Sequence, residues 1–303
     1  MNKVSVIIPT YNCVRFLSES IQSALSQTYQ DFEIIIIDDG SKDNTREIVE
    51  GFIQRNPGKI RYIYQENGGL AVARNTGIKN SNGKYIALLD SDDTWLPNRL
   101  SAQIPIMESD SKIGLVHANI TRINEEGQPV RTPSRDREFL LGDIFEYIFL
   151  RKTDIACPTV LFRRECCDKV GLFDEYLTRL GCEDRELWLR ITQHYKVGYV
   201  DEVLAHYRIL NNSMSKNLEK MITARCYVVD KISKGNRIAS RLRIQALARV
   251  YRDAGDVLLS GHDFDDARRK YMKSLGYAPF SRWTYINLIK AILRMPIKLN
   301  VYY

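Results

Sequence analysis

Hydrophobic and polar positions along the first ninety residues alternate between two periods. Short runs rich in β-branched residues predict four strands, at 4–8, 33–37, 61–64 and 85–89. Apolar residues at steps of three and four predict the amphipathic helices between them, within 17–28, 44–52 and 70–79. This alternation predicts right-handed crossovers and a mostly parallel, Rossmann-like sheet with helices on both faces. Ligands of such sheets bind at the carboxyl ends of the strands.

Local signals predict further elements. Asn44 followed by Glu47 resembles a capping box at the start of the second helix. In the less regular segment from 95 to 175, three features stand out: a turn at Asn124–Gly127, a mobile polar loop at Thr132–Arg137, and a buried strand at Cys157–Phe162. The mobile loop is of the kind that closes over a bound donor.

The chain from about 216 onward has helical periodicity throughout. We therefore expect an α/β domain at 1–215 and a basic α-helical region at 216–303. A last helix is predicted from Arg282 to Leu299. On it, a basic stripe (Lys290, Arg294, Lys298) runs beside an apolar one (Ile286, Ile289, Leu293, Ile297). This pattern fits a helix lying on anionic lipid, and it fits equally a packed helix with a solvated basic face.

Composition narrows the class of protein. The 303 residues are 44% hydrophobic and 27% charged, which is typical of a globular protein and excludes disordered and collagen-like chains. No apolar run reaches the roughly 18–20 residues of a membrane span. The six cysteines have no metal-ligand spacing and no CxxC pair, and no signal peptide is evident, so we expect free thiols and a cytoplasmic location.

Charge is unevenly distributed along the chain. The net charge of +7 combines a balance of −4 over 1–215 with +11 over 216–303. The basic region could face anionic lipid, an acidic polymer or nucleic acid. Nucleic acid is the least favoured of these, because no recognition motif accompanies the charge.

Polar residues follow three of the predicted strands. They are Pro9–Asn12, Asp38–Ser41 and Asp90–Asp93. One acidic turn is explained by the turn and cap preferences of Asp and Ser, but two at one edge of a sheet require a cation or a hydrogen-bonding ligand. Neither GxGxxG nor GxxxxGK[ST] is present. The carboxylates of Asp90 and Asp92 instead provide hard oxygen ligands suited to Mn²⁺ or Mg²⁺.

Five segments, in order, resemble glycosyltransferase family 2. They are VSVIIPTYN at 4–12, IIIDDGSKDNT at 35–45, GGLAVARNTGI at 68–78, LLDSDD at 88–93 and CEDRELWLRI at 182–191. The resemblance covers residues 1 to about 215. It implies a GT-A fold, a nucleotide-sugar donor (most often a UDP-sugar), a divalent metal and inversion at the anomeric carbon.

The resemblance also implies a donor-binding set. Thr10 and Tyr11 would hold the nucleobase and ribose, in a turn shaped by Pro9. Asp39 would accept a hydrogen bond from the uracil ring NH. The remaining members lie on the third helix and after the fourth strand: Arg74 near the acidic edge, Asp90 on the ribose, and Ser91 beside it.

The same resemblance assigns the reacting groups. Asp92 would ligate the metal on the diphosphate, Asp184 would act as general base, and Glu183 would help to orient the acceptor. The chemistry independently requires such groups, since charge grows on the leaving diphosphate and the attacking hydroxyl loses a proton. A simpler interpretation of Glu183 and Asp184 is that they are acids in the first turn of a helix.

Other positions carry open alternatives. Trp188 is expected in the core, whereas Trp95 could pack in the core or face a sugar ring. The family usually has Tyr-Arg-x-His near the end of its catalytic domain, followed by serines. Here Leu210 takes the place of that histidine, although Ser213 and Ser215 follow, and His206 is not a safe substitute for it.

These observations favour a cytoplasmic glycosyltransferase, peripheral to the inner face of a membrane. It would transfer a hexosyl or N-acetylhexosaminyl group from a UDP-sugar to a lipid-linked saccharide or a surface polysaccharide precursor. Two alternatives are a nucleotidyltransferase that makes nucleotide sugars and a catalytically silent nucleotide-sugar-binding protein. The sequence leaves the sugar, the acceptor and the oligomeric state open.

Overall fold

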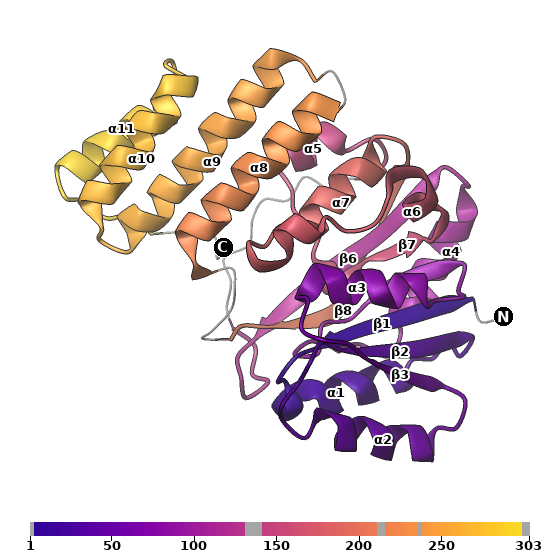
Figure 1. Ribbon diagram of the computed structural model, residues 1–303. Coiled ribbons are helices and arrows are strands. Elements are labelled where there is room, and N and C mark those ends of the chain that lie inside the picture. The colour runs from indigo at the N-terminus through magenta and orange to yellow at the C-terminus, as the bar shows by residue number, and fades with distance from the viewer. Residues whose placement is uncertain (1–2, 131–140, 211–215, 236–237, 299–303) are drawn as a thin grey trace.

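The computed structural model describes residues 3–130, 141–210, 216–235 and 238–298. An eight-stranded sheet runs through an α/β body with helices on both faces, and four further helices extend from one side of it (Figure 1). Within the described residues, every helix is too short or too polar to cross a bilayer.

The first half of the sheet is parallel, as predicted. Its strands are β1 (Val4–Thr10), β2 (Phe32–Asp38), β3 (Ile60–Tyr64) and β4 (Tyr85–Leu88), in the spatial order β3-β2-β1-β4. They alternate with α1 (Val14–Leu25), α2 (Thr45–Arg55) and α3 (Leu70–Lys79). Because β1 pairs with both β2 and β4, their carboxyl ends share one edge of the sheet.

The second half continues the sheet in the order β4-β7-β6-β8-β5. Its strands are β5 (Thr94–Trp95), β6 (Ile113–Ile123), β7 (Leu161–Arg163) and β8 (Lys196–Arg208). The intervening helices are α4 (Arg99–Ser109), α5 (Phe145–Phe149), α6 (Glu165–Val170) and α7 (Glu183–Thr192), with 3-10 turns η1 (Cys157–Thr159) and η2 (Glu175–Arg179). β7 is antiparallel to β4 and β6, whereas β6 and β8 are parallel.

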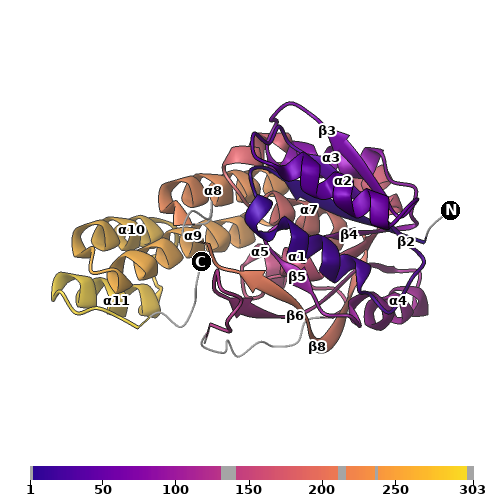
Figure 2. The same ribbon diagram turned by 90° about the horizontal axis from the view of Figure 1, so that it is seen from below.

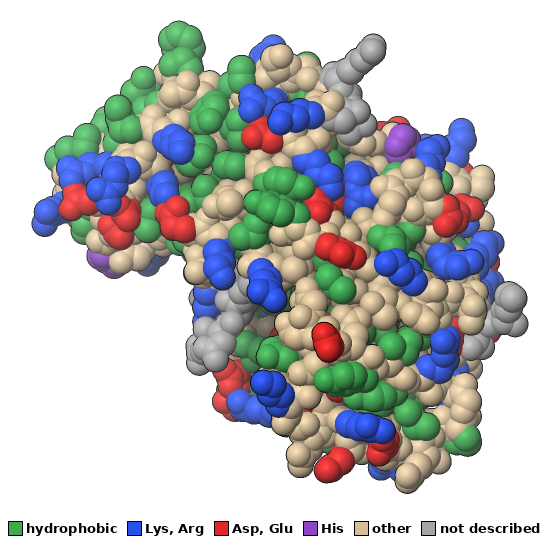
Figure 3. Space-filling model, in the orientation of Figure 1, with side chains coloured by type: hydrophobic (Ala, Val, Ile, Leu, Met, Phe, Trp, Pro, Cys, Tyr) green, Lys and Arg blue, Asp and Glu red, His purple; other side chains and the backbone are tan. Residues whose placement is uncertain are grey.

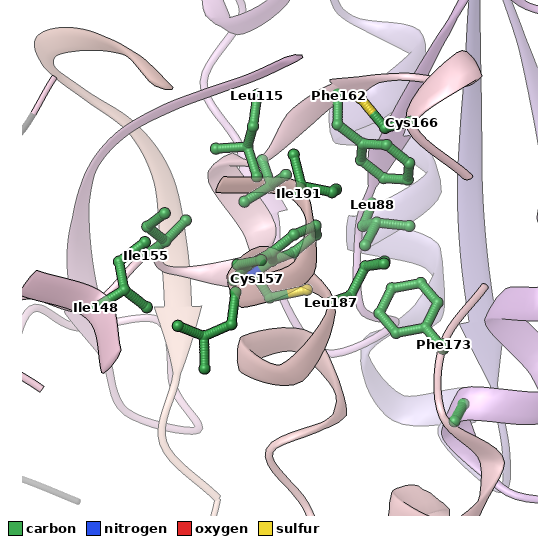
Figure 4. Packing of buried hydrophobic residues seen from close by; sticks show 14 of the residues in the cluster. Leu88, Leu115, Ile148, Ile155, Cys157, Phe162, Cys166, Phe173, Leu187 and Ile191 are labelled. Atoms are coloured by element: carbon green, nitrogen blue, oxygen red, sulfur yellow. The ribbon is translucent and has the colours of Figure 1, made fainter. Parts of the chain in front are cut away.

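The isoleucine run of β2 is buried on both faces, which explains its nearly continuous apolar character. Ile34 and Ile36 pack with α1 and α2, and Ile35 and Ile37 pack on the opposite face. Figure 4 shows part of this second cluster. At its centre lies Trp188, buried as predicted, whose ring meets those of Phe162 and Phe173 edge-on at centroid distances of 5.8 and 6.2 Å.

The C-terminal helices are α8 (Leu218–Gly235), α9 (Ser240–Ser260), α10 (Phe264–Tyr277) and α11 (Arg282–Ile292), and they project from the body (Figure 2). α8 packs on α7, and four of its buried apolar residues belong to the same cluster as Trp188: Ala224, Val228, Val229 and Ile232. The Nζ of Lys231 lies 2.7 Å from a carboxylate oxygen of Asp174 and 2.7 Å from one of buried Glu186. α10 and α11 form a separate small cluster with the end of α9. The domain boundary at 215 stays a prediction, and residues 211–215 lie outside the described chain.

Several local predictions need correction. Asn44 is the N-cap residue of α2 but makes no capping bond. The neighbouring Asp43 accepts instead, from the backbone N of Thr45 at 3.2 Å and its hydroxyl at 2.6 Å. Only the end of the strand predicted at Cys157–Phe162 is extended, because Pro158 lies in the 3-10 turn η1.

The last helix also differs from its prediction, since it ends at Ile292 and not at Leu299. Arg294 has a φ of +53°, so Lys290, Arg294 and Lys298 do not form one helical stripe. Other predictions are confirmed: Asn124–Gly127 is a turn, and all six cysteines are free. The loop predicted at Thr132–Arg137 lies outside the described residues.

We expect Gly77→Ala to lower the free energy of unfolding by about 1–3 kcal/mol, measured by urea denaturation. α3 lies so close to β1 that a Cβ at Gly77 would be 2.4 Å from Cγ2 of Ile7. Gly51→Ala in α2 is the matched control, because a Cβ there meets nothing nearer than 4.0 Å. That change should stabilise the protein by up to about 1 kcal/mol through helix propensity. Equal stability of the two variants would contradict this account of the packing.

Candidate active site

The loops that follow β1 and β2 are bonded to each other. The backbone N of Asn12 donates to the hydroxyl of Ser41 at 3.0 Å, and Lys42 N donates to the Asn12 side chain at 2.8 Å. Asn12 has a φ of +48°, a conformation that Asn tolerates better than most residues. The two loops thus form one edge at the carboxyl ends of the strands.

The predicted residues of the β1 segment differ in exposure. Pro9 lies inside β1, opposite Ile37, and not in the turn itself. Thr10 is buried, and its hydroxyl has no hydrogen-bond partner among the described residues. Tyr11, the first residue after β1, is 49% exposed. A buried hydroxyl without a partner beside an exposed aromatic ring suits a planar ligand with polar groups.

Asp39 fixes the loop that leads into α3. One carboxylate oxygen accepts from Gln65 Nε2 at 2.7 Å and from Gly68 N at 2.9 Å, and the other accepts from Gly69 N at 2.7 Å. Gly69 has a φ of +89°, which a residue with a side chain rarely adopts. These three hydrogen bonds therefore hold the Asp39 carboxylate in one orientation, directly after β2.

Arg74 joins two acidic segments. The residue is 1% exposed, and its guanidinium donates from Nη1 to Glu183 Oε1 and from Nη2 to Asp90 Oδ1, both at 2.7 Å. The sequence places Arg74 with the donor, and the structure places it beneath the site, between the loop after β4 and the start of α7. Ser91, in that same loop, is also buried.

Glu183 and Asp184 open α7 after Cys182, whose φ is +68°. Burial raises the pKa of Glu183 to about 7, and the Arg74 guanidinium opposes this shift. Burial also raises the pKa of Asp184, which is likewise close enough to Arg74 and Asp90 to be influenced by both. The structure therefore brings together the acidic segments at 90 and 183–184.

The simpler interpretation, acids in the first turn of a helix, fits the positions of Glu183 and Asp184 and also that of a third acid, Glu186. It is fully buried and forms an ion pair with Arg190 in the same helix and another with Lys231 of α8. By contrast, Glu183 faces Arg74, and the backbone N of Arg185 donates to Asp184 at 2.6 Å. Of these three acids, Glu183 and Asp184 therefore join Asp90 in the acidic cluster around Arg74.

Asp92, the predicted metal ligand, lies in the acidic loop after β4. Burial and the neighbouring charge of Asp90 raise its pKa to about 6. Its carboxylate accepts no hydrogen bond from another residue in the described part of the chain. No three His, Cys, Asp or Glu side chains of the described residues cluster tightly enough to hold a metal by themselves. One carboxylate completed by ligand phosphates is, however, a common way to bind Mg²⁺, so the oxygen donor of Asp92 fits such an ion.

Sequence reasoning gave no role to Arg208, the last residue of β8. Its side chain is buried and donates from Nε to the carbonyl of Asp92 at 2.8 Å and from Nη2 to Glu19 at 2.6 Å. Its backbone N donates to Asp93 Oδ1 at 2.8 Å. The loop of Asp90–Asp93 is therefore clamped by a residue 115 positions further on, whose only sequence signal is the arginine of the Tyr-Arg pair.

His206 and Leu210 are the two residues discussed above in connection with the family histidine. The Nδ1 of His206 lies 3.3 Å from the hydroxyl of Thr94, across the pairing of β5 and β8. Leu210 is half-buried, and Ser213 and Ser215 lie outside the described residues.

Trp95 is buried under the guanidinium of Arg99, 3.8 Å from its ring centroid, so it packs in the core.

Comparison with known proteins gives the family. The model of "Glycosyl transferase family 2" matches residues 5–171. The chain belongs to glycosyltransferase family 2. It is 34% identical over 233 residues to the Escherichia coli protein WfaP, named UDP-Glc:alpha-D-GlcNAc-diphosphoundecaprenol beta-1,3-glucosyltransferase, with 77% of this chain and 87% of WfaP covered. It spans about a third of the length of Rickettsia proteins named as uncharacterized glycosyltransferases, to which it is 39–41% identical.

Solved structures confirm the predicted GT-A fold. TarS residues 1–349 of Staphylococcus aureus, in complex with UDP-GlcNAc, superpose with a TM-score of 0.68 at 18% identity, covering 96% of this chain and 88% of TarS. The mannosyltransferase PcManGT of Pyrobaculum calidifontis, in complex with GDP-Man and Mn²⁺, gives 0.60 at 18% identity, covering 97% and 86%. The likeness to TarS extends over the C-terminal helices as well as the catalytic body.

We expect Glu183→Gln to change how stability depends on pH. An unfolded Glu releases its proton near pH 4.5, whereas the folded protein keeps it to about pH 7, so the free energy of unfolding falls as pH rises through this window. Glutamine removes this contribution. From pH 4.5 to pH 7 the unfolding free energy of wild type should therefore fall, relative to that of the variant, by on the order of 2–3 kcal/mol.

The measurement is urea unfolding of wild type and variant at both pH values. Glu126→Gln, in the exposed turn after β6, is the control and should leave the slope of wild type unchanged. If Glu183→Gln also keeps the wild-type slope, the buried position of this carboxyl group does not govern its titration.

Proposed function

We propose that the protein is an inverting glycosyltransferase that transfers a sugar from a UDP-sugar to a hydroxyl group. The observation that carries this proposal is the Arg74 bridge, which holds a loop on the donor side next to the start of α7, where Asp184 lies. Donor and acceptor chemistry need such proximity, because the attacking oxygen and the leaving diphosphate act on one carbon atom.

The donor side is supported by the edge formed after β1 and β2. Thr10 and Tyr11 offer a buried hydroxyl and an exposed ring. Asp39 Oδ2, which accepts one hydrogen bond from Gly69 N, would also accept one from a ring NH. UDP-sugars are the donors in the TarS complex with UDP-GlcNAc and in the name of WfaP. These relatives favour UDP over other nucleotides for this chain.

Asp92 would hold the divalent cation, Mn²⁺ or Mg²⁺, together with the donor diphosphate. When bound, the cation neutralises the charge that develops on the leaving group. The position of Asp92 is fixed by Arg208, which donates hydrogen bonds to the Asp92 carbonyl and the Asp93 carboxylate. The PcManGT complex with GDP-Man and Mn²⁺ supports a cation in this fold.

Asp184 would accept the proton of the acceptor hydroxyl. The hydroxyl oxygen bonds to the anomeric carbon as the bond to the diphosphate breaks, and the proton passes to the Asp184 carboxylate. The raised pKa of Asp184 makes its carboxylate a stronger base than an exposed aspartate. Glu183, held by Arg74, fixes the first turn of α7 and so the direction of its neighbour.

The acceptor is proposed from the name of WfaP, whose acceptor sugar is linked to diphosphoundecaprenol. We infer a lipid-linked saccharide or surface polysaccharide precursor and a cytoplasmic protein at the inner face of the membrane. The choice between hexose and N-acetylhexosamine is left to the donor assay.

Donor class is tested by calorimetric titration of UDP-glucose, UDP-GlcNAc and GDP-mannose with and without Mn²⁺. We expect the UDP-sugars to bind and GDP-mannose to fail. Asp92→Ala should weaken Mn²⁺-dependent binding by at least on the order of tenfold. Asp168→Ala, an exposed aspartate of α6, is the control. Binding of GDP-mannose alone would overturn the UDP assignment, and unchanged binding by Asp92→Ala would overturn the metal assignment.

Asp184→Asn is expected to retain donor binding and lose transfer. The amide occupies the same space but cannot take the proton, so turnover should fall on the order of 10²–10⁴-fold. UDP release in the presence of a GlcNAc-diphospholipid acceptor measures the rate, and titration with UDP shows that the donor site remains intact. Transfer at the wild-type rate would show that another group is the base.

A further inference from the structure

The last helix, α11, has its polar and apolar sides exchanged relative to an ordinary surface helix. The side that packs against the protein carries Thr284, Asn287, Leu288 and Ala291. Asn287 donates to Asp256 at 2.8 Å, and Thr284 is bonded to Ser281. Two of its four buried residues are thus polar, whereas a packed helix normally buries its large apolar side chains.

Apart from Leu288, the large apolar side chains of α11 are exposed. We call the following set the α11 outer face: Phe280, Trp283, Ile286, Ile289, Ile292, Leu293 and Met295, all of them exposed. Phe280 is 95% exposed, Trp283 58% and Ile289 54%. Figure 3 shows hydrophobic side chains gathered at the end of the molecule where Figure 1 places α10 and α11. Apolar groups of this size on one surface mark a site of contact with another apolar phase or molecule.

Cationic side chains lie on α11 and after it, whereas those of Arg268, Arg269 and Lys270 on α10 form ion pairs with Asp265, Asp266 and Glu219. No acidic residue follows Asp266, whereas residues 267–298 contain eight Lys and Arg. Arg282 and Lys290 lie on α11 itself, and Arg294 and Lys298 follow it. A second copy of the chain would bring like charges together at this face, so the charge does not favour self-association.

We propose that the α11 outer face docks on an anionic lipid surface, with α11 lying in the interface. The basic residues match the charge of the headgroups, the aliphatic side chains enter the acyl boundary, and Trp283 and Tyr285 supply the aromatic rings that favour this depth. At 11 residues α11 is about 17 Å long, which suits a helix that lies along a membrane surface. The proposal does not depend on the donor or the acceptor.

Trp283 provides a direct probe. The other tryptophans, Trp95 and Trp188, are buried, so Trp283 accounts for the exposed emission of the full chain. On vesicles of phosphatidylglycerol and phosphatidylcholine, we expect a blue shift of emission, protection from acrylamide and quenching by brominated acyl chains. Phosphatidylcholine vesicles should give none of these. Trp283→Phe should still float with the anionic vesicles and lose the signal.

Two variants divide the proposal into its parts. Arg282→Glu with Arg294→Glu should weaken flotation with anionic vesicles by at least about 25-fold, from about fivefold for each charge removed. Trp283→Ser with Ile289→Ser should weaken it at least about tenfold. All four side chains are exposed, so we expect the fold to be retained.

Matched controls lie on the catalytic body. Lys79→Glu with Lys112→Glu reverses two exposed charges, and Leu141→Ser removes an exposed apolar side chain. Both should float as wild type does. Absence of flotation, or equal loss in test and control variants, would overturn the proposal. So would a blue-shifted Trp283 without lipid that depends on protein concentration, because it would show that a second copy covers the face.

Discussion

The candidate active site depends on one buried cation, Arg74, held between Asp90 and Glu183. Arg74 is enclosed by protein and bonded at equal distances to Asp90 and Glu183, which are 93 residues apart in the sequence. Removing one partner of such a buried pair typically costs about 3–5 kcal/mol, because the charge that remains lies uncompensated in a medium of low polarity. The loop after β4 and the start of α7 are therefore joined by charge as well as by packing.

α3 carries this link and extends it in both directions. At its start, Gly68 and Gly69 are bonded to Asp39, and further along, Asn75 donates to the carbonyl of Phe173 at 3.0 Å and to Glu175 at 2.9 Å. α7 is in turn joined to α8 by the ion pair between Glu186 and Lys231. The loops of the first two strands, the acidic loop and the C-terminal helices are thus connected through rigid elements.

Much of this arrangement could be predicted from the sequence, because local patterns specify it. The buried strands β1, β2 and β4 are apolar runs, and the predicted bounds of α3 agree with the structure. The sequence singles out the acidic segments at 90–92 and 183–184, and in the structure Arg74 bonds to Asp90 of the first and Glu183 of the second. The role of Arg208 could not be predicted, since its partners lie up to 189 residues away. The orientation of α11 could not be predicted either, because an apolar stripe containing Ile286, Ile289 and Leu293 fits a helix packed on protein as well as one facing lipid.

The packing of α8 has a consequence for how such chains can vary. Its apolar side lies in the core with Trp188, and Lys231 neutralises Glu186 inside the body, so α8 is structurally a part of the catalytic unit. By comparison, α10 and α11 contact the rest mainly through α9. A chain built on this plan can exchange α10 and α11 for other elements without disturbing the contact of α8 with the core.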